Sequence, residues 1–483
     1  MAMQRDLPPC CAPRVHTRVP RPPAVPSLEI CVREDAVTRP DELRDAVQML
    51  WSRQLERATL REGELLDTAA VEGLSKSIHH IRVCDLDDAV DGTVHLYLHS
   101  LYDEEPAEET AEGDESTVAF QMWSLPALPF DGLWETLLFE EDVKKRLLRY
   151  VSSSVHFASM QVDSQVIAWN RVVLLHGPPG TGKTSLCRGL AHKLSIRLSG
   201  RYRQSHLLEI NAHSLFSKWF SESGKMVMSM FARVTELLEE GDAFVTVLID
   251  EVESLSAARQ AAVSGGEPSD AVRVVNALLT QLDQLRRFPN VIVLATSNLM
   301  GAIDPAFIDR ADLKLYIGPP GVSASYHILS SCVSELCRAR IVSAADTFLS
   351  LSSLTPLLPE GGASYEMLRA LPTESGARSQ VARQSMVLHA IAAACDGLSG
   401  RALRKLPFLA HALYLREGAR ETPVDEFLEA LHKAVLHERQ ARRAMQDLRI
   451  RWTREEIVCA AQAFRGVGGC TSGYSLSLRF RFA

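Results

Sequence analysis

One segment constrains the fold of this chain more than any other. Residues 177–184, with the sequence GPPGTGKT, match the phosphate-loop pattern G-x-x-x-x-G-K-S/T without a mismatch. The loop follows an apolar run, RVVLLH at 171–176, and precedes a segment that is typical of a helix, TSLCRGLAHKL. Strand, glycine-rich loop and helix are the context in which this pattern binds phosphate. The sequence therefore predicts a nucleotide-binding α/β domain.

The chemistry of this loop predicts how it binds ATP. Its glycines let backbone N–H groups surround an anion without Cβ clashes, and the helix N-terminus adds roughly half a unit of positive charge. Lys183 is expected to reach the β- and γ-phosphates, and the Thr184 hydroxyl to bind Mg²⁺. We expect the whole loop to form the nucleotide site: Gly177, Pro178, Pro179, Gly180, Thr181, Gly182, Lys183 and Thr184.

Polar side chains end two further apolar runs. FVTVLIDE ends in Asp250 and Glu251, at the carboxyl edge of a predicted central strand, where open α/β sheets bind ligands. We expect Asp250 to join Thr184 in the Mg²⁺ shell, and Glu251 to orient the attacking water or accept its proton. NVIVLAT leads to Asn298, whose amide either hydrogen-bonds the γ-phosphate or the water, or caps an ordinary loop.

The alternation of elements predicts the architecture. Strand candidates at 171–176, 207–211, 244–249, 290–296 and 313–317 alternate with segments long enough for helices. This order predicts a parallel sheet that is covered by helices on both faces. Helical periodicity alone continues after it, and three short strands with a helical stretch at 41–66 precede it. We therefore expect a helical domain after the α/β domain and a small α+β domain before it.

Domain boundaries are expected where these patterns change. The acidic run at 103–115 holds eight carboxylates in thirteen residues and predicts a solvated loop. The adjacent His79 and His80 are expected in a surface turn. The predicted parts are a disordered arm at 1–27, an N-terminal domain at 28–122, a large α/β domain at 123–320, a helical domain at 321–440 and an atypical tail at 441–483.

Composition narrows the functional classes. The 483 residues carry a formal net charge of −8, which disfavours a protein that coats nucleic acid. No apolar run approaches the 18 or so residues that span a bilayer, and the N-terminus lacks the apolar core of a secretory signal. The ten cysteines show no metal-binding pair spacing, which favours reduced thiols in an intracellular protein. We expect neither a membrane nor a direct nucleic-acid partner.

The phosphate loop, the Asp250–Glu251 strand end, Asn298 and the segment FIDRAD at 307–312 together resemble the AAA+ ATPase family. The resemblance implies an ATPase domain with a parallel sheet, followed by a helical lid domain. It gives Asn298 the role of a nucleotide sensor. It also makes Arg310 an arginine finger that acts on ATP held by the neighbouring subunit, which suits a reaction that is assisted by cations near developing charge.

The helical domain carries one more motif of this resemblance. The segment GLSGR at 397–401 is similar to the family motif that reads the nucleotide state from the lid. The resemblance therefore makes Arg401 the candidate sensor residue, with Arg404 as its near competitor.

The resemblance extends to a narrower family. Stretches such as LFSKWFSESGK, IDEVESL and GLSGRALRKLPFLAHALY are similar to pachytene checkpoint protein 2, densely from about residue 134 to 435. The similarity implies a homohexamer that uses ATP to remodel HORMA-domain proteins, usually through a HORMA-like adaptor. It implies roles in spindle-checkpoint inactivation and in meiotic axis remodelling, recombination and synapsis. The implied location is nuclear and cytoplasmic, on chromosomes in meiosis and at kinetochores in mitosis.

Lys218, Trp219 and Phe220 stand out in the short polar segment SKWFSESG. Two adjacent large aromatic side chains cannot both face one core from a loop, and the residues alone leave loop anchoring and a binding role equally open. The family resemblance implies that the segment lies in the axial pore of the ring. There an aromatic ring grips a threaded chain through its large contact area. Residues 257–269, which are small and flexible in composition, are the candidate second pore loop.

Two other functions stay open at this point. A nucleic-acid-directed AAA+ loader or helicase would need a basic pore, which the acidic net charge and the aromatic pore candidate disfavour. An ATP-binding scaffold with little hydrolysis would not need Glu251 and Arg310, and both are present.

Overall fold

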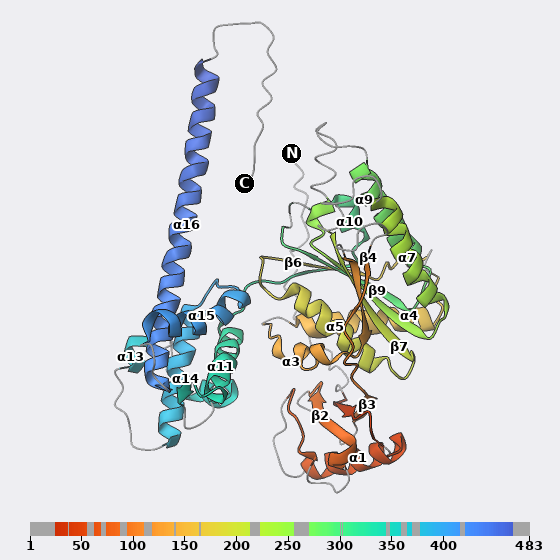
Figure 1. Cartoon of the computed structure of the whole chain (residues 1–483), viewed down its shortest axis with the longest axis horizontal. Helices are drawn as coiled ribbons and strands as arrows, with labels where there is room; N and C mark the ends of the chain where they lie inside the picture. The colour runs from red at the N-terminus through yellow and green to blue at the C-terminus, as the bar shows by residue number, and fades with distance from the viewer. Residues whose placement is uncertain are drawn as a thin grey trace, which may run out of the picture. The chain divides into compact units, whose positions relative to one another are not determined.

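The structure is a computed structural model that divides into two compact units (Figure 1). The first comprises Met1–Leu137, Lys145–His176 and Lys183–Leu315, and the second Leu138–Lys144, Gly177–Gly182 and Tyr316–Ala483. The structure describes residues 25–36, 38–55, 62–68, 74–86, 94–110, 118–139, 142–163, 166–212, 223–255, 270–299, 301, 303–343, 348–358, 365–369, 377–415 and 421–466.

The first unit contains a small sheet with the strand order β2-β1-β3. Strand β1 (Ser27–Val32) runs antiparallel to β2 (Ile78–Cys84) and parallel to β3 (His95–His99). Helix α1 (Pro40–Leu55) packs its apolar residues on this sheet, and the short α2 (Leu74–Ser77) leads into β2. The shared core is built from Leu28, Ile30, Leu43, Val47, Leu50, Trp51, Ile78, Ile81 and Val83. This is the small α+β domain that the sequence predicts.

Two details of this domain differ from the expectations. Helix α1 ends at Leu55 rather than near residue 66, and Leu65 instead forms an isolated bridge with Arg82. His79 and His80 lie inside strand β2 rather than in a surface turn, because β2 pairs with β1 from Ile78 onward. His80 is buried and His79 is exposed.

The first unit also contains a larger sheet with the order β10-β6-β9-β8-β7-β5-β4. Its four central strands are parallel, as predicted, whereas β5 runs antiparallel to β7 and β4 antiparallel to β5. The strands are β4 (Ala107–Thr110), β5 (Val118–Leu125), β6 (Val172–His176), β7 (Gln204–Asn211), β8 (Ala243–Asp250), β9 (Val291–Ser297) and β10 (Leu313–Tyr316).

Strand β4 lies inside the acidic run at 103–115, where we expected a loop. It forms the edge of the sheet, and Gln121 of β5 donates a hydrogen bond of 2.8 Å to its Glu108. Charged side chains on an edge strand hinder pairing with another chain, so the acidic composition suits this position. Because β5 pairs with β7, the large sheet also takes in residues on both sides of the expected boundary at 122.

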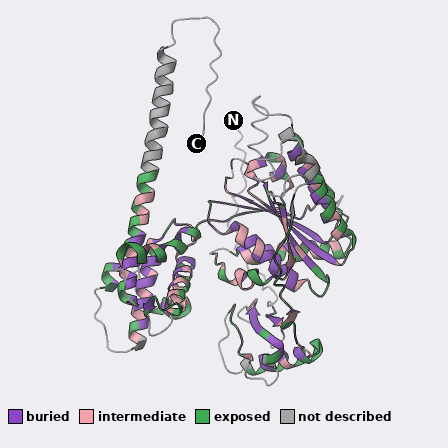
Figure 2. Ribbon diagram, in the orientation of Figure 1, coloured by how far each residue is buried: buried purple, intermediate pink, exposed green. Residues whose placement is uncertain are grey.

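Helices cover both faces of the large sheet, and the buried residues concentrate along its strands (Figure 2). α7 (Ser223–Glu239) and α9 (Asp270–Leu285) share a core with alternate residues of β6 to β9, while α5 (Lys183–Arg197) contacts β7, β8 and β9. The shorter elements of this region are η2 (Leu128–Phe130), α3 (Leu133–Thr136), α4 (Val143–Ser159) and α10 (Pro305–Arg310).

The second unit is helical, as expected. Its core is formed mainly by α11, α14, α15 and α16, with Leu329, Leu388, Leu403 and Leu431 fully buried. Helix α16 continues through the first part of the predicted tail. The elements are α11 (Val322–Arg338), β11 (Val342–Ser343), α12 (Leu351–Leu354), η4 (Thr355–Leu357), α13 (Tyr365–Arg369), α14 (Ala377–Ala394), α15 (Gly400–Tyr414), β12 (Thr422–Pro423) and α16 (Val424–Gly466).

Membrane-spanning helices were not expected. In the part of the chain that the structure describes, no helix has both the length and the apolar character needed to cross a bilayer.

Candidate nucleotide site

The phosphate loop has a backbone that requires glycine. Gly177, Gly180 and Gly182 have φ angles of 150°, 77° and 92°, which residues with a Cβ rarely adopt. At Gly177 a Cβ would lie 2.1 Å from the carbonyl oxygen of Ile317, so no other residue fits there without a backbone shift. The Thr181 hydroxyl donates to the Pro178 carbonyl at 3.0 Å and closes the loop internally.

The last two residues of the loop motif, Lys183 and Thr184, begin helix α5. Lys183 is buried, with 5% of its surface exposed. The Thr184 hydroxyl donates to both carboxylate oxygens of Asp250, at 3.0 and 3.2 Å. Asp250 reaches this position because β8 is buried between β7 and β9 and ends at the carboxyl edge of the sheet, where Asn211 is its register partner on β7. The structure thus brings together two of the predicted site residues.

Thr296 is a residue of this site that the sequence analysis missed. Its hydroxyl donates a short hydrogen bond to Asp250 Oδ1 and accepts one of 3.3 Å from the Glu251 backbone N–H. It is buried in β9, one position before the strand end. Its one signal in the sequence is a polar residue at the end of an apolar run, which does not distinguish a site residue from an ordinary strand residue.

Glu251 has an unusual backbone conformation. Its φ angle is +59°, a region that costs a residue with a long side chain about 1–3 kcal/mol and is enriched at functional sites. The backbone N–H of Val252 donates to the Thr296 carbonyl at 3.0 Å. Together with the bond from the Glu251 N–H to the Thr296 hydroxyl, it fixes the peptide groups before and after Glu251. The Glu251 side chain is partly exposed at the same sheet edge as Asp250.

Asn298 lies directly after β9, at the carboxyl edge that also carries Asp250. Its backbone N–H donates to the Glu253 carboxylate at 3.1 Å, which ties the loop after β9 to the loop after β8. The residue is partly buried.

Arg310 ends helix α10 and is held by a carboxylate of its own chain. Its Nε and Nη2 donate to the two oxygens of Asp283, at 3.0 and 2.7 Å, and Nη1 donates to the Ala306 carbonyl at 2.8 Å. The hydrogen bonds to Asp283 raise the pKa of Arg310 above its ordinary value. The Arg310 side chain keeps 26% of its surface exposed, so it remains accessible from outside.

Arg401 lies beside the phosphate loop within the second unit. Its backbone N–H donates to the Gly180 carbonyl at 3.2 Å, and a Cβ placed on Gly180 would lie 3.1 Å from the Arg401 Cβ. Ser399 caps the N-terminus of α15, and this cap fixes where the helix begins and therefore the position of Arg401 in its first turn. Arg404 follows three residues later on the same helix and is exposed.

The predicted pore residues Lys218, Trp219 and Phe220 lie outside the residues that the structure describes, as does the second candidate loop at 257–269.

The helix that follows the phosphate loop is anchored by ion pairs. Arg188 donates to both oxygens of Glu209 on β7 at 2.7 Å, and these hydrogen bonds raise the pKa of Arg188. Further along, the ammonium of Lys193 lies 2.7 Å from Glu29 and 2.8 Å from Glu135. Side-chain exposure is 2% for Lys193 and 1% for Glu29. The second cluster therefore links α5 to strand β1 of the N-terminal domain through buried charges.

Opposing effects act on the pKa of Lys193. Burial lowers it, but the neighbouring carboxylates, Glu29 foremost, raise it above its ordinary value. For Glu135 burial raises the pKa, and Lys193 more than offsets this, so that the pKa is lowered. The Cys84 thiol also lies 3.1 Å from the Lys193 ammonium.

Comparison with known protein families agrees with this geometry. Residues 173–319 match the family described as "ATPase family associated with various cellular activities (AAA)". Residues 321–439 match "TRIP13-like, AAA+ ATPase lid C-terminal domain". The two matches meet at the end of the large sheet, so they coincide with the ATPase fold and with the helices that follow it.

Individual relatives are similar over most of the chain. The pachytene checkpoint protein 2 homolog of Danio rerio is 46% identical over 418 residues, which cover 86% of this chain and 93% of that protein. The Homo sapiens homolog is 50% identical over 344 residues, covering 71% and 75%. Among solved structures, C. elegans PCH-2 superposes with a TM-score of 0.65 at 30% identity, covering 86% of this chain and 99% of that one.

Proposed function

This chain belongs to the pachytene checkpoint protein 2 family of AAA ATPases, and on that premise we propose that it uses ATP hydrolysis to remodel HORMA-domain proteins. One observation carries the proposal for ATP chemistry. The Thr184 hydroxyl and the Asp250 carboxylate meet at 3.0 Å directly after a phosphate loop whose backbone requires glycine. The family similarity carries the proposal for the substrate class.

The residues present fit Mg²⁺ bound together with ATP. Mg²⁺ prefers a few protein oxygens and takes its other ligands from water and phosphate, and the Thr184 hydroxyl and Asp250 carboxylate offer such oxygens. The ion would offset charge that develops on the phosphates. Lys183 and the loop backbone would bind the phosphates, and Glu251 would orient the attacking water and accept its proton, with Asn298 beside it.

The lid contribution is proposed for Arg401 rather than Arg404. Support comes from the hydrogen bond of 3.2 Å between the Arg401 backbone and Gly180, which keeps this residue next to the loop that binds the phosphates. A guanidinium at that place adds positive charge where the nucleotide carries its negative charge.

We propose that Arg310 acts on the ATP of a neighbouring subunit in a homohexamer. Within its own chain Arg310 pairs with Asp283, and the pair is partly exposed, as a residue that serves a second subunit must be. Asp283 holds the guanidinium in a fixed direction, so the loss of side-chain entropy on reaching the neighbour's phosphate is reduced.

Mixing two inactive variants tests this action between subunits. Arg310→Ala keeps an intact Glu251, and Glu251→Gln keeps an intact Arg310, so each variant supplies what the other lacks when they are neighbours in one ring. In a random equal mixture we expect ATP turnover to recover to about a quarter of wild type, because half the sites keep Glu251 and half of their neighbours keep Arg310. Phosphate release is measured before and after subunit exchange.

The control for this mixture is Arg287→Ala, an exposed arginine that lies over the Phe288 ring. It should remain active alone. A mixture that stays as inactive as its two components, although mixed rings are detected by mass, would contradict an action of Arg310 across the subunit boundary.

Threading of the substrate is proposed for the segment Lys218, Trp219 and Phe220. Trp219→Ala should keep ATP binding but lose remodelling of an adaptor-bound HORMA protein by about tenfold or more, as expected when an aromatic anchor worth about 2 kcal/mol is removed. Trp219→Phe is the matched control and should retain most of the activity, because a ring remains. Remodelling by Trp219→Ala at the wild-type rate would exclude the threading role.

Recruitment of the adaptor is proposed for the small N-terminal sheet with α1, which has its own apolar core. The names of the relatives suggest work on chromosomes, and we propose that the protein acts there in meiosis and in checkpoint inactivation. ATPase activity measured with and without a purified HORMA protein and its adaptor, with the ring size determined on the same sample, tests these assignments together.

A further inference from the structure

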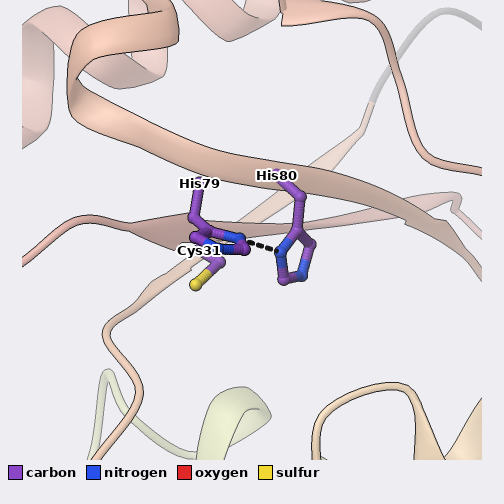
Figure 3. A group of neighbouring side chains, drawn as sticks. All are labelled: Cys31, His79 and His80. Carbon is purple, nitrogen blue, oxygen red and sulfur yellow. Dashed lines mark hydrogen bonds between the residues drawn. The ribbon is translucent and has the colours of Figure 1, made fainter. Parts of the chain in front are cut away.

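Three potential metal ligands meet at one place in the N-terminal sheet, far in sequence from the nucleotide site. Cys31 belongs to β1, and His79 and His80 to β2 (Figure 3). One ligand atom from each of them lies within 4.8 Å of the other two. The Nδ1 atoms of the two imidazoles are 3.0 Å apart.

An irregularity of strand pairing explains how two adjacent histidines reach the same place. Successive side chains of a strand point to opposite faces, so neighbours normally diverge. Here Cys31 pairs with His80 but Val32 pairs with Ile78, which leaves His79 as an extra residue between two pairs. A bulge of this kind redirects a side chain, and the two rings consequently meet edge to face, at 82°.

The ligand set and its spacing fit a transition metal. Thiolate and imidazole together favour Zn²⁺, which binds Cys sulfur at about 2.3 Å and His nitrogen at about 2.0 Å. Tetrahedral geometry at those bond lengths places the two nitrogens about 3.3 Å apart and each nitrogen about 3.5 Å from the sulfur. The nitrogens are already close to that spacing. Because His79 is exposed, its ring can rotate to reach the spacing that the metal needs without disturbing the core.

Besides the nitrogen that binds the metal, a metal-binding histidine needs a partner for its other ring nitrogen, and the surroundings of His80 provide one. Its Nδ1 faces His79, and its other ring nitrogen, Nε2, lies 3.6 Å from Asp131 Oδ1. Metal-bound histidines usually donate their second N–H to a carboxylate, which fixes the orientation of the ring. The His80 side chain is 9% exposed, and Nε2 has no hydrogen-bond partner at shorter range in the described residues.

The charges nearby are compatible with a bound cation. Two cations act on the three side chains. Arg82 donates from Nη1 to Asp131 at 2.8 Å, so the carboxylate balances its charge, and Arg33 directs its Nε to the Ile78 carbonyl at 3.4 Å. A second group of potential ligands in the described residues, Glu29, Cys84 and Glu135, is different. The Lys193 ammonium already lies among those side chains, so that group has its cation.

We propose that Cys31, His79 and His80 form a Zn²⁺ site that joins β1 to β2, with a water molecule as fourth ligand. Binding converts the Cys31 thiol to a zinc-bound thiolate and releases its proton to solvent, so no oxidant or reductant is needed. The metal would fix the bulge and hold the N-terminal domain in one conformation. It takes no part in ATP hydrolysis.

Cobalt substitution of the purified full chain tests the site directly. Apo-protein titrated with Co²⁺ should bind one equivalent with a thiolate-to-metal absorption band, and Zn²⁺ should displace it. Cys31→Ser should abolish the band. His79→Gln removes a direct ligand, so it should weaken Co²⁺ affinity by at least the roughly 10–100-fold that loss of an outer-shell partner costs. His79→Gln changes an exposed side chain, so it tests the site even where Cys31→Ser fails to fold.

Controls separate this site from other thiols and imidazoles. Cys332→Ser and His411→Gln, both in the helical unit, should leave the band and the affinity unchanged. Cys10→Ser combined with Cys11→Ser tests for metal held by the adjacent cysteines of the N-terminal arm. A wild-type chain that shows no thiolate band, or a band that survives Cys31→Ser, would overturn the proposal.

Discussion

Glu251→Gln is expected to lower ATP turnover by about 10²–10⁴-fold, the usual contribution of a general base, while ATP binding persists. Glutamine keeps the size and hydrogen-bonding reach of the side chain but cannot accept the proton of the attacking water. The phosphate loop and the Thr184–Asp250 pair are untouched, so the nucleotide remains bound. Phosphate release and the retention of labelled ATP on the isolated ring measure the two effects separately.

The Glu251→Gln substitution should leave the backbone conformation at this position unchanged. The φ angle of +59° is imposed by the turn, in which Thr296 accepts from the Glu251 N–H, and glutamine meets the same requirement. The control is Glu240→Gln, an exposed carboxylate just after α7, which should leave turnover unchanged. Turnover by Glu251→Gln within about tenfold of wild type would remove Glu251 from the role of base.

Lys193→Met should destabilise the chain by about 3–5 kcal/mol, because it leaves buried carboxylates without their cation. Glu29 has 1% of its side chain exposed and its ion pair with Lys193 measures 2.7 Å. Since the pair joins β1 to α5, the N-terminal domain should lose its attachment to the ATPase domain first. Denaturant unfolding and limited proteolysis between these domains measure the effect.

A second variant identifies the cause of this loss. Lys193→Met combined with Glu29→Gln removes the more deeply buried of the two carboxylate charges that lose their cation, so the double variant should be more stable than Lys193→Met alone. Lys405→Met, at an exposed lysine, is the matched control and should unfold like wild type. If Lys193→Met destabilised the chain no more than Lys405→Met does, the buried cluster would have no structural role.

Much of the fold could be predicted because its signals are local. The five strand candidates of the ATPase domain coincide with β6 to β10, since apolar runs of that length bury well between helices. Predictions failed where pairing decides the structure. β4 is a strand inside an acidic run because β5 offers it a partner, and His79 and His80 lie in β2 because β1 pairs with Ile78 and His80, on either side of His79.

The residues of the candidate site also fall into those that could be predicted from the sequence and those that could not. The phosphate loop and the strand ends at Asp250 and Asn298 could be located from the residues themselves. Thr296, which hydrogen-bonds Asp250, and Asp283, which holds Arg310, could not, because a threonine near a strand end or an aspartate on a helix carries no local signal that is specific to a site.

The phosphate loop, the α/β order of the ATPase domain and the helical domain behind it can be recognised from the amino-acid sequence without a structure. These features depend on consecutive residues and on short periodicities. Three contacts become visible once the chain is folded. Thr184 meets Asp250, 66 residues away, Lys193 lies against Cys84, 109 residues away, and a bulge brings Cys31 and two histidines together. Such contacts arise from strand order and register, which pair residues by position in space and leave no mark on their neighbours in the chain.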